Sequence, residues 1–243
     1  MENISVNNLT DSTNSSLPRN IKVALAKEVL TQEKNIEIAK EKFAEIVKDL
    51  EQKKQKEVIN ATGTVLHTNL GRSPNNISFS GRYTNVEYDL KNFKRGVRNE
   101  YLSSSLSSFL RCEEVTFVNN NASSLYLSLR AMAKNYEFKN VIISRGEIIE
   151  IGGSYRLPEI IQETGLQMIE VGTTNKTNLN DYTKALKDFP NSIILKVHRS
   201  NYSISGFTEE VSIKELSEIK ENYETVLIHD LGSGLVVDRK FLE

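Results

Sequence analysis

The sequence predicts an α/β fold built on a mostly parallel sheet and preceded by a small helical N-terminal segment. After Val58, short β-branched runs alternate with amphipathic stretches. These runs are near-continuously apolar, which is typical of parallel strands covered by helices on both faces. Before Val58, apolar residues recur at steps of three and four among Glu and Lys, which indicates amphipathic helices.

The α/β part contains a regular alternation of expected strands and helices. The expected strands are Val115–Val118, Val141–Ser144, Gln167–Val171, Ile193–Val197 and Val226–Ile228. The expected helices are Ala122–Lys134, Arg156–Thr164, Leu179–Lys187 and Ser212–Asn222. Ligands of parallel sheets bind outside the carboxyl ends of the strands, so the loops after the strands are the first place to look for chemistry.

The chain divides by its texture into three parts. Residues 1–17 are rich in Asn, Ser and Thr and are expected to form a disordered tail, because they can bury little apolar surface. Residues 18–57 are expected to form one helix broken near Thr31, or two helices. Residues 58–243 are expected to form the α/β domain.

Composition excludes several classes of protein. With 38% hydrophobic and 26% charged residues and a mean hydropathy of −0.40, the 243-residue chain is neither collagen-like nor disordered in bulk. No apolar run is long enough to span a bilayer, so we expect no membrane association and a cytoplasmic protein. The single Cys112, expected to be buried, and three histidines without metal-site spacing predict no metal centre.

The loop Asn119–Ser124 follows an expected strand and precedes an expected helix. A helix N-terminus presents unpaired N–H groups and the positive end of the helix dipole, so this loop could bind a phosphate. Asn as an ordinary capping residue explains the loop equally well. It lacks the glycine spacing of a P-loop or a dinucleotide fingerprint.

Asp230 ends another expected strand and precedes a Gly-x-Gly turn. Taken alone, it is better explained as a turn residue than as a ligand to a metal or to a protonated ring nitrogen. An anion loop and a carboxylate at the same sheet edge together favour a ligand with a phosphate and a cationic heteroaromatic nitrogen, which describes pyridoxal phosphate. Asn201 also follows a strand and could reach that ligand.

A basic stretch runs from Arg72 to Arg98, with six basic side chains against two acidic ones. Arg95 and Arg98 flank Gly96, and guanidinium groups suit bidentate binding of oxyanions. A solvated loop explains the same pattern about as well.

Many short motifs occur together in order. They are Ile59–Arg72, Glu87–Leu90, Lys94–Gly96, Asn119–Ala122, Ser144–Glu147, Glu150–Ser154, Glu170–Asn175, Lys196–His198, Ser200–Tyr202, Gly206–Glu210 and Asp230–Gly234. Collinearly from about Val58 to Asp238, the chain resembles the bacterial selenocysteine synthase family, the L-seryl-tRNA(Sec) selenium transferases.

The resemblance implies a fold-type-I enzyme dependent on pyridoxal phosphate, assembled as a ring of dimers. Such an enzyme converts seryl-tRNA(Sec) to selenocysteinyl-tRNA(Sec) with selenophosphate, through an aminoacrylyl intermediate. The motifs imply that Asn120, Asn121, Ala122 and Ser123 hold the cofactor phosphate. Asn201 would lie near the ring hydroxyl, Asp230 would pair with the pyridine nitrogen, and Glu150 would lie close to the ring. Arg95, Arg98 and Arg72 would bind the anionic selenium donor.

The chain departs from the family pattern in three ways. The cofactor lysine of the family lies in a Ser-Gly-Asp-Lys motif that residues 1–243 do not contain, so we expect this chain alone to be inactive. The resemblance also leads us to expect that this chain lacks the family's C-terminal small domain and has a shortened N-terminal tRNA-recognition region. Two alternatives stay open at this point: a related pyridoxal-phosphate lyase acting on a small amino sugar or amino acid, and a non-catalytic remnant or partner subunit.

Overall fold

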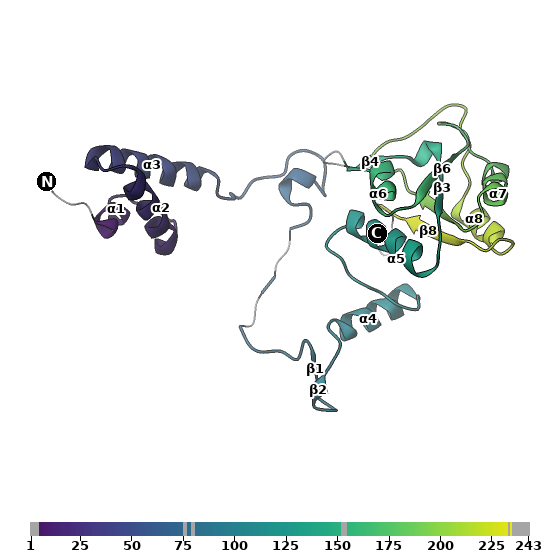
Figure 1. Cartoon of the computed structure of the whole chain (residues 1–243), viewed down its shortest axis with the longest axis horizontal. Coiled ribbons are helices and arrows are strands. Elements are labelled where there is room, and N and C mark those ends of the chain that lie inside the picture. The colour runs from purple at the N-terminus through teal and green to yellow at the C-terminus, as the bar shows by residue number, and fades with distance from the viewer. Residues whose placement is uncertain (1–4, 75–76, 79–80, 152–154, 233, 235–243) are drawn as a thin grey trace. The chain divides into compact units, whose positions relative to one another are not determined.

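The computed structural model describes residues 5–74, 77–78, 81–151, 155–232 and 234. The chain separates into two compact units, Met1–Arg82 and Tyr83–Glu243. Figure 1 shows the helical first unit in purple and blue and the α/β second unit in teal to yellow. Within the described residues, no helix is both long enough and apolar enough to cross a membrane.

The first unit contains three α-helices among its described residues. They are α1 (Val6–Asp11), α2 (Arg19–Gln32) and α3 (Ile36–Gln52), followed by the 3₁₀ turn η1 (Thr68–Leu70). The side chain of Asn35 caps α3 by accepting hydrogen bonds from two backbone N–H groups of its first turn. Of the two alternatives expected for residues 18–57, one helix broken near Thr31 or two helices, the structure has two helices, separated at residues 33–35.

The expectation of a disordered tail over residues 1–17 is wrong for the residues that the structure describes. The side chain of Ser5 caps α1, and the side chain of Leu9 is fully buried. Leu9 and Leu17 pack into one cluster with Ala26 and Phe43. Two apolar side chains suffice because they complete an apolar face that α2 and α3 already present.

The second unit begins with a small hairpin and a separate helix. Strands β1 (Tyr88–Asp89) and β2 (Lys94–Arg95) pair in an antiparallel arrangement and precede α4 (Glu100–Leu110). The sequence interpretation assigned no helix to α4. Its Ser-rich composition hides the apolar spacing of Leu102, Leu106 and Phe109, because Ser favours helix interiors only weakly.

The rest of the second unit is an alternation of strands and helices. In chain order these are α5 (Asn121–Asn135), β3 (Asn140–Ser144), η2 (Arg145–Glu147), β4 (Glu150–Ile151), β5 (Tyr155–Arg156), α6 (Leu157–Glu163), β6 (Gln167–Val171), α7 (Leu179–Asp188), β7 (Ser192–Val197), α8 (Ile213–Lys220) and β8 (Val226–Asp230).

The central sheet has the strand order β6-β3-β7-β8, and all of its neighbouring strands are parallel. Alternate side chains of β3 and β7 point to opposite faces, so two cores form. Helices α5 and α6 pack on the face that carries Ile143 and Leu195, and α7 and α8 pack on the face that carries Ile142 and Ile194 (Figure 1). The predicted α/β class with a mostly parallel sheet is confirmed.

The segment around Val115–Val118 is not a strand. Val115 is half-buried, Phe117 and Val118 are exposed, and no described strand pairs with this run. A β-branched run forms a strand only where a neighbour completes its hydrogen bonds, which the local sequence does not reveal. The neighbouring Cys112, expected to be buried, is exposed.

Candidate functional site

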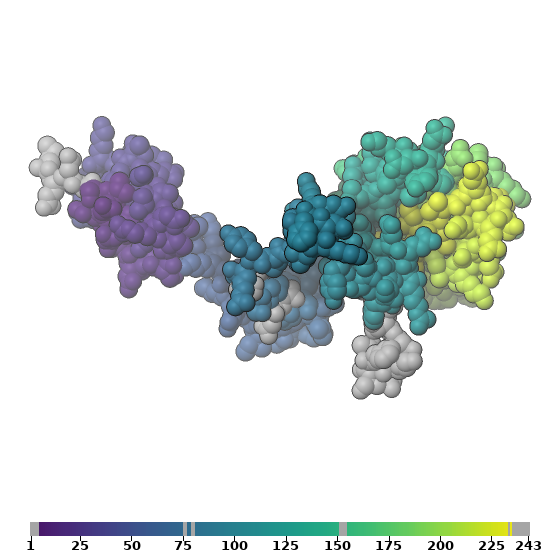
Figure 2. All heavy atoms as spheres, turned by 90° about the horizontal axis from the view of Figure 1, so that it is seen from below, coloured from purple at the N-terminus to yellow at the C-terminus, as the bar shows by residue number. Residues whose placement is uncertain are grey.

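The candidate site lies at the carboxyl edge of the central sheet, where β7 and β8 end. Val197, the last residue of β7, pairs in register with Asp230, the last residue of β8. The backbone N–H of His198 then donates to the carbonyl oxygen of Asp230 over 2.9 Å. The loop that follows β7 and the turn that follows β8 therefore begin side by side. Figure 2 shows the yellow segment around β8 at the surface of the second unit.

The N-terminus of α5 meets Asp230 directly. The amide Nδ2 of Asn121, the first residue of α5, donates to Asp230 Oδ1 over 2.7 Å. The backbone N–H of Gly232 donates to the same oxygen over 3.0 Å. The loop expected to bind an anion and the carboxylate expected to face a ring nitrogen are thus brought together, as the sequence predicts.

Asn120 is the N-cap of α5, and its side-chain oxygen accepts from the backbone N–H of Ser123 over 2.8 Å. The capping interpretation of this loop is therefore confirmed, and the phosphate site stays a prediction. Capping uses one of the free N–H groups of the first turn and leaves those of Asn121 and Ala122 without a partner inside the helix. These groups, with the Ser123 hydroxyl, fit an anion approaching along the helix axis.

The Asp230 carboxylate fits a cationic ring nitrogen. Asp230 is buried, and both bonds from the described residues go to Oδ1. Oδ2 accepts none of the hydrogen bonds donated by that part of the chain, so it can accept one from a protonated heteroaromatic nitrogen. An ionised carboxylate held in a poorly solvated place stabilises such a cation strongly. The residues present therefore fit the pyridoxal phosphate that the sequence predicts.

Asn201 and Glu150 also lie close together. Asn201 Nδ2 donates to the backbone oxygen of Glu150 over 3.4 Å. The carboxylate of Glu150 accepts from Arg156 Nε over 2.7 Å and raises the pKa of the Arg156 guanidinium above its ordinary value. The two residues therefore stand at neighbouring loops, with the Glu150 carboxylate engaged by Arg156. Their roles towards a cofactor stay predictions.

The basic residues form a separate cluster. Arg95 Nη2 and Arg98 Nη2 lie 3.5 Å and 3.2 Å from the two carboxylate oxygens of Glu87, one oxygen each. None of the described contacts joins them to Asp230 or Asn121. Arg72 belongs to the first unit, where it is exposed and follows the turn at Gly71. The role of these three arginines in binding an anion stays a prediction.

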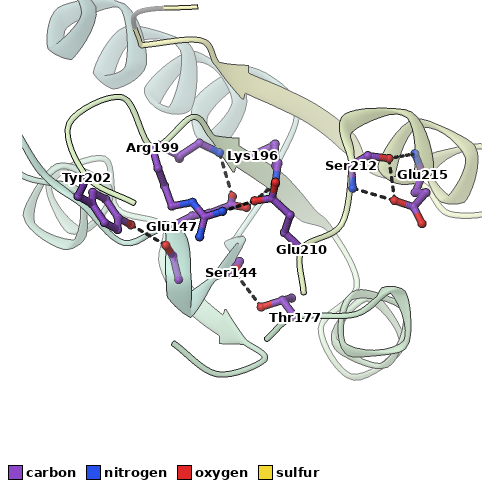
Figure 3. A network of polar contacts seen from close by, with 11 residues as sticks. Ser144, Glu147, Thr177, Lys196, Arg199, Tyr202, Glu210, Ser212 and Glu215 are labelled. Carbon is purple, nitrogen blue, oxygen red and sulfur yellow. Dashed lines mark hydrogen bonds and ion pairs between the residues drawn. The ribbon is translucent and has the colours of Figure 1, made fainter. Parts of the chain in front are cut away.

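The sequence interpretation missed a buried ion pair beside the site. Glu147 Oε1 lies 2.5 Å from Lys196 Nζ, and Glu147 Oε2 accepts from the backbone N–H of Val197 over 3.0 Å (Figure 3). Both side chains are almost fully buried. The signal in the sequence was a lysine near the end of an otherwise apolar strand and a glutamate just after another strand. Among the described residues, no group of three His, Cys, Asp or Glu side chains could hold a metal.

Comparison with known proteins identifies relatives of the whole α/β part. Residues 58–242 match the family described as SelA, L-seryl-tRNA selenium transferase. The L-seryl-tRNA(Sec) selenium transferase of Aliarcobacter butzleri is 46% identical over 198 residues, which cover 79% of this chain and 43% of that protein. The one from Sulfurimonas denitrificans is 41% identical over 241 residues, which cover 92% of this chain and 53% of that protein. The chain spans about half the length of these curated relatives.

Among solved structures, D-glucosaminate-6-phosphate ammonia-lyase matches 54% of this chain and 37% of its own, with a TM-score of 0.46 and 15% identity. An aromatic-amino-acid aminotransferase from Burkholderia pseudomallei, covalently bound to pyridoxal phosphate, matches 45% of this chain and 27% of its own, with a TM-score of 0.34 and 13% identity. The family match over residues 58–242 is supported by relatives at 41–47% identity. The chain therefore belongs to the L-seryl-tRNA selenium transferase family.

Proposed function

We propose that this chain forms the cofactor-binding part of a fold-type-I enzyme that converts seryl-tRNA(Sec) to selenocysteinyl-tRNA(Sec). Pyridoxal phosphate is the cofactor, and selenophosphate is the selenium donor. The observation that supports this proposal is the hydrogen bond between Asn121 and Asp230, because it joins the N-terminus of α5 to a buried carboxylate in a chain of this family.

Each end of the cofactor has a partner in this proposal. The N-terminus of α5, with Asn120, Asn121, Ala122 and Ser123, binds the phosphate through N–H groups and a hydroxyl. Asp230 holds a proton on the pyridine nitrogen, which is what allows the cofactor, when bound, to act as an electron sink at the substrate Cα.

The remaining site residues act around the ring and the donor. Asn201 orients the ring through its hydroxyl, and Glu150 lies close to the ring edge. Arg95 and Arg98 bind the anionic donor, which must compete with the Glu87 carboxylate for these two guanidinium groups. Arg72, in the first unit, is a further candidate for binding the donor.

Two further parts of the proposal concern assembly and activity. Large apolar side chains of the second unit are exposed, including Phe93, Tyr101 and Phe109, which supports association with other copies of the protein. Light scattering of the purified chain tests this association, and a monodisperse monomer contradicts it.

Because residues 1–243 contain no Ser-Gly-Asp-Lys motif, we expect this polypeptide to bind the cofactor without forming a covalent bond to it.

The experiment is a titration of the 243-residue chain with pyridoxal phosphate, followed by cofactor absorbance and fluorescence. We expect saturable binding that Asp230→Asn weakens. Treatment with borohydride should then leave no reduced cofactor on any lysine, as measured by intact mass. A stoichiometric adduct contradicts non-covalent binding, and no saturable binding contradicts the cofactor site itself.

A second titration uses tRNA. Seryl-tRNA(Sec) should bind and should lose affinity as salt rises, because phosphate contacts release counterions. If the chain binds tRNA and small amino acids equally well, the lyase alternative is favoured. If it binds neither, a non-catalytic remnant is favoured.

A further inference from the structure

Two points in the first part of the loop after β7 are fastened to one turn. The turn is η2, which follows β3. At the start of the loop, the Glu147 carboxylate binds Lys196 Nζ and the N–H of Val197. A few residues further along the loop, the Tyr202 hydroxyl donates to the backbone oxygen of Gly146 over 2.6 Å (Figure 3). Residues 198–201 are therefore held between two fixed points, which we call the η2 clamp: Gly146, Glu147, Lys196, Val197 and Tyr202.

Stability alone does not account for the ion pair within the clamp. Glu147 is 3% exposed and Lys196 is 9% exposed, so both charges lose most of their hydration on folding. The desolvation of such a pair can exceed its Coulombic attraction, and apolar side chains of similar volume often give equal stability. The carboxylate has a geometric effect instead, because its two oxygens bind both the side chain of Lys196 and the backbone at Val197.

The clamped loop carries the candidate cofactor contacts. Val197 is in register with Asp230, and the N–H of His198 donates to the carbonyl oxygen of Asp230. At the other side of the loop, Asn201 Nδ2 reaches the backbone oxygen of Glu150. Fixing the chain at Val197 and at Tyr202 therefore fixes Asn201 with respect to Asp230.

We propose that Glu147 is a positioning residue whose carboxylate, through Lys196 and the N–H of Val197, holds the loop after β7 so that Asn201 and Asp230 face the cofactor ring together. This inference rests on the proposed function. Glu147 acts through β7 and does not line the ring pocket. Its partner Lys196 shares one face of β7 with Ile194, whereas Asp230 lies in register with Val197, whose side chain points to the opposite face.

The test compares matched variants of the 243-residue chain. Glu147→Met combined with Lys196→Met removes both charges at similar volume and removes the acceptor for Val197. Glu147→Gln combined with Lys196→Met also removes both charges but keeps a side-chain oxygen for the N–H of Val197. Tyr202→Phe releases the second fixed point of the η2 clamp. Glu170→Gln is the control, because it breaks the exposed ion pair that Arg145 of the same turn makes.

Two readouts are used: the Kd for pyridoxal phosphate and hydrogen exchange of the backbone over residues 198–202. For the double Met variant and for Tyr202→Phe we expect the Kd to rise about tenfold. Loss of a hydrogen-bond partner that orients a metal-binding side chain weakens metal binding by a similar factor. Exchange over 198–202 should be faster in both. The Gln and Met pair should recover most of the affinity, and Glu170→Gln should behave as the parent.

The outcomes separate this inference from the proposed function. If the double Met variant folds and has the parent's Kd and hydrogen-exchange rates, the positioning role of the clamp is overturned. If the double Met variant does not fold, the same two measurements on Tyr202→Phe decide. If the parent binds no pyridoxal phosphate, the cofactor site is wrong, and exchange over 198–202 then decides the clamp alone: faster exchange supports it, and unchanged exchange overturns it.

Discussion

Asn121 and Asp230 are 109 positions apart in the chain, yet Asn121 Nδ2 lies 2.7 Å from Asp230 Oδ1. This bond joins the first residue of α5 to the last residue of β8. It gives a buried carboxylate a neutral donor and leaves its charge intact. It also sets the distance between the helix end and the carboxylate, which a ligand bridging the two must match.

Asn121→Ala should therefore destabilise the second unit by about 1 kcal/mol, because the charged Asp230 loses a hydrogen bond while Asn121 itself is exposed. The Kd for pyridoxal phosphate should rise in the same variant. Denaturant unfolding and the cofactor titration check both effects. Ser124→Ala, an exposed change in the same helical turn, is the control. An Asn121→Ala variant with unchanged stability and Kd would contradict the link.

Gly172→Ala should be among the most damaging single changes. Gly172 has φ +66°, and a Cβ there would lie 2.3 Å from Thr177 Oγ1 and 2.7 Å from the Lys176 oxygen. Backbone strain and overpacking together predict a loss of about 3 kcal/mol. Gly165→Ala is matched for a positive φ (+83°), but its nearest neighbour is 3.6 Å away, so it should lose only about 1 kcal/mol. Equal losses of stability in the two variants would show that the structure shifts to remove the contacts between the new Cβ at position 172 and its neighbours.

Ser212→Ala tests the capping box at the start of α8. The Ser212 side chain accepts from the N–H of Glu215. The Glu215 carboxylate accepts first from the Ser212 hydroxyl and then from the Ser212 N–H, and both bonds lower the pKa of Glu215. Removing the cap should cost about 1 kcal/mol of unfolding free energy. Ser217→Ala, an exposed change inside the same helix, should not destabilise. Loss of stability from Ser217→Ala equal to that from Ser212→Ala would rule out the capping effect.

His229 predicts a specific pH dependence. Its pKa is lowered from 6.5, first by desolvation and then by the charge of Lys196; His198 acts in the same direction, and Asp230 and Glu147 oppose it. The unfolded chain therefore takes up a proton near pH 6.5 that the folded chain still resists. Stability should fall as pH drops below about 6.5 and should stop falling below the folded pKa.

Unfolding free energies measured between pH 8 and pH 5.5 check this effect. His229→Gln should flatten the slope in that window. Carboxyl groups such as Glu33 and Glu51, whose pKa values are lowered from 4.5, contribute their stability above that pH and lose it only under more acidic conditions. If the unfolding free energy of His229→Gln keeps the same dependence on pH, another group is responsible for that dependence.

Much of the second unit could be predicted because its elements carry strong local patterns. The β3 and β7 runs are apolar on both faces, and the helices between them show amphipathic spacing, so their bounds differ from the expected ones by only a few residues. The sequence also predicts that Asn121 and Asp230 lie at the same edge of the sheet, and they do, although the strand expected before Asn121 is wrong.

The failures share a different cause. Val115–Val118 has the composition of a strand but no described partner, and the stretch from α1 to Leu17 has the composition of a tail but two buried leucines, Leu9 and Leu17. Glu147 and Lys196 are ordinary charged residues in the sequence, and only the register of β3 and β7 reveals that they meet. Pairing and burial depend on distant segments, which a local pattern does not contain.

The bond between Asn121 and Asp230 also has a consequence for biosynthesis. A ribosome adding about 5–20 residues per second needs roughly 5–20 s to progress from Asn121 to Asp230. During that interval the nascent α5 has no carboxylate beside it, and β7 has no β8 to pair with. If the proposed cofactor site is right, the cofactor can bind there only after β8 has left the exit tunnel, so its binding would report that β8 has joined the sheet.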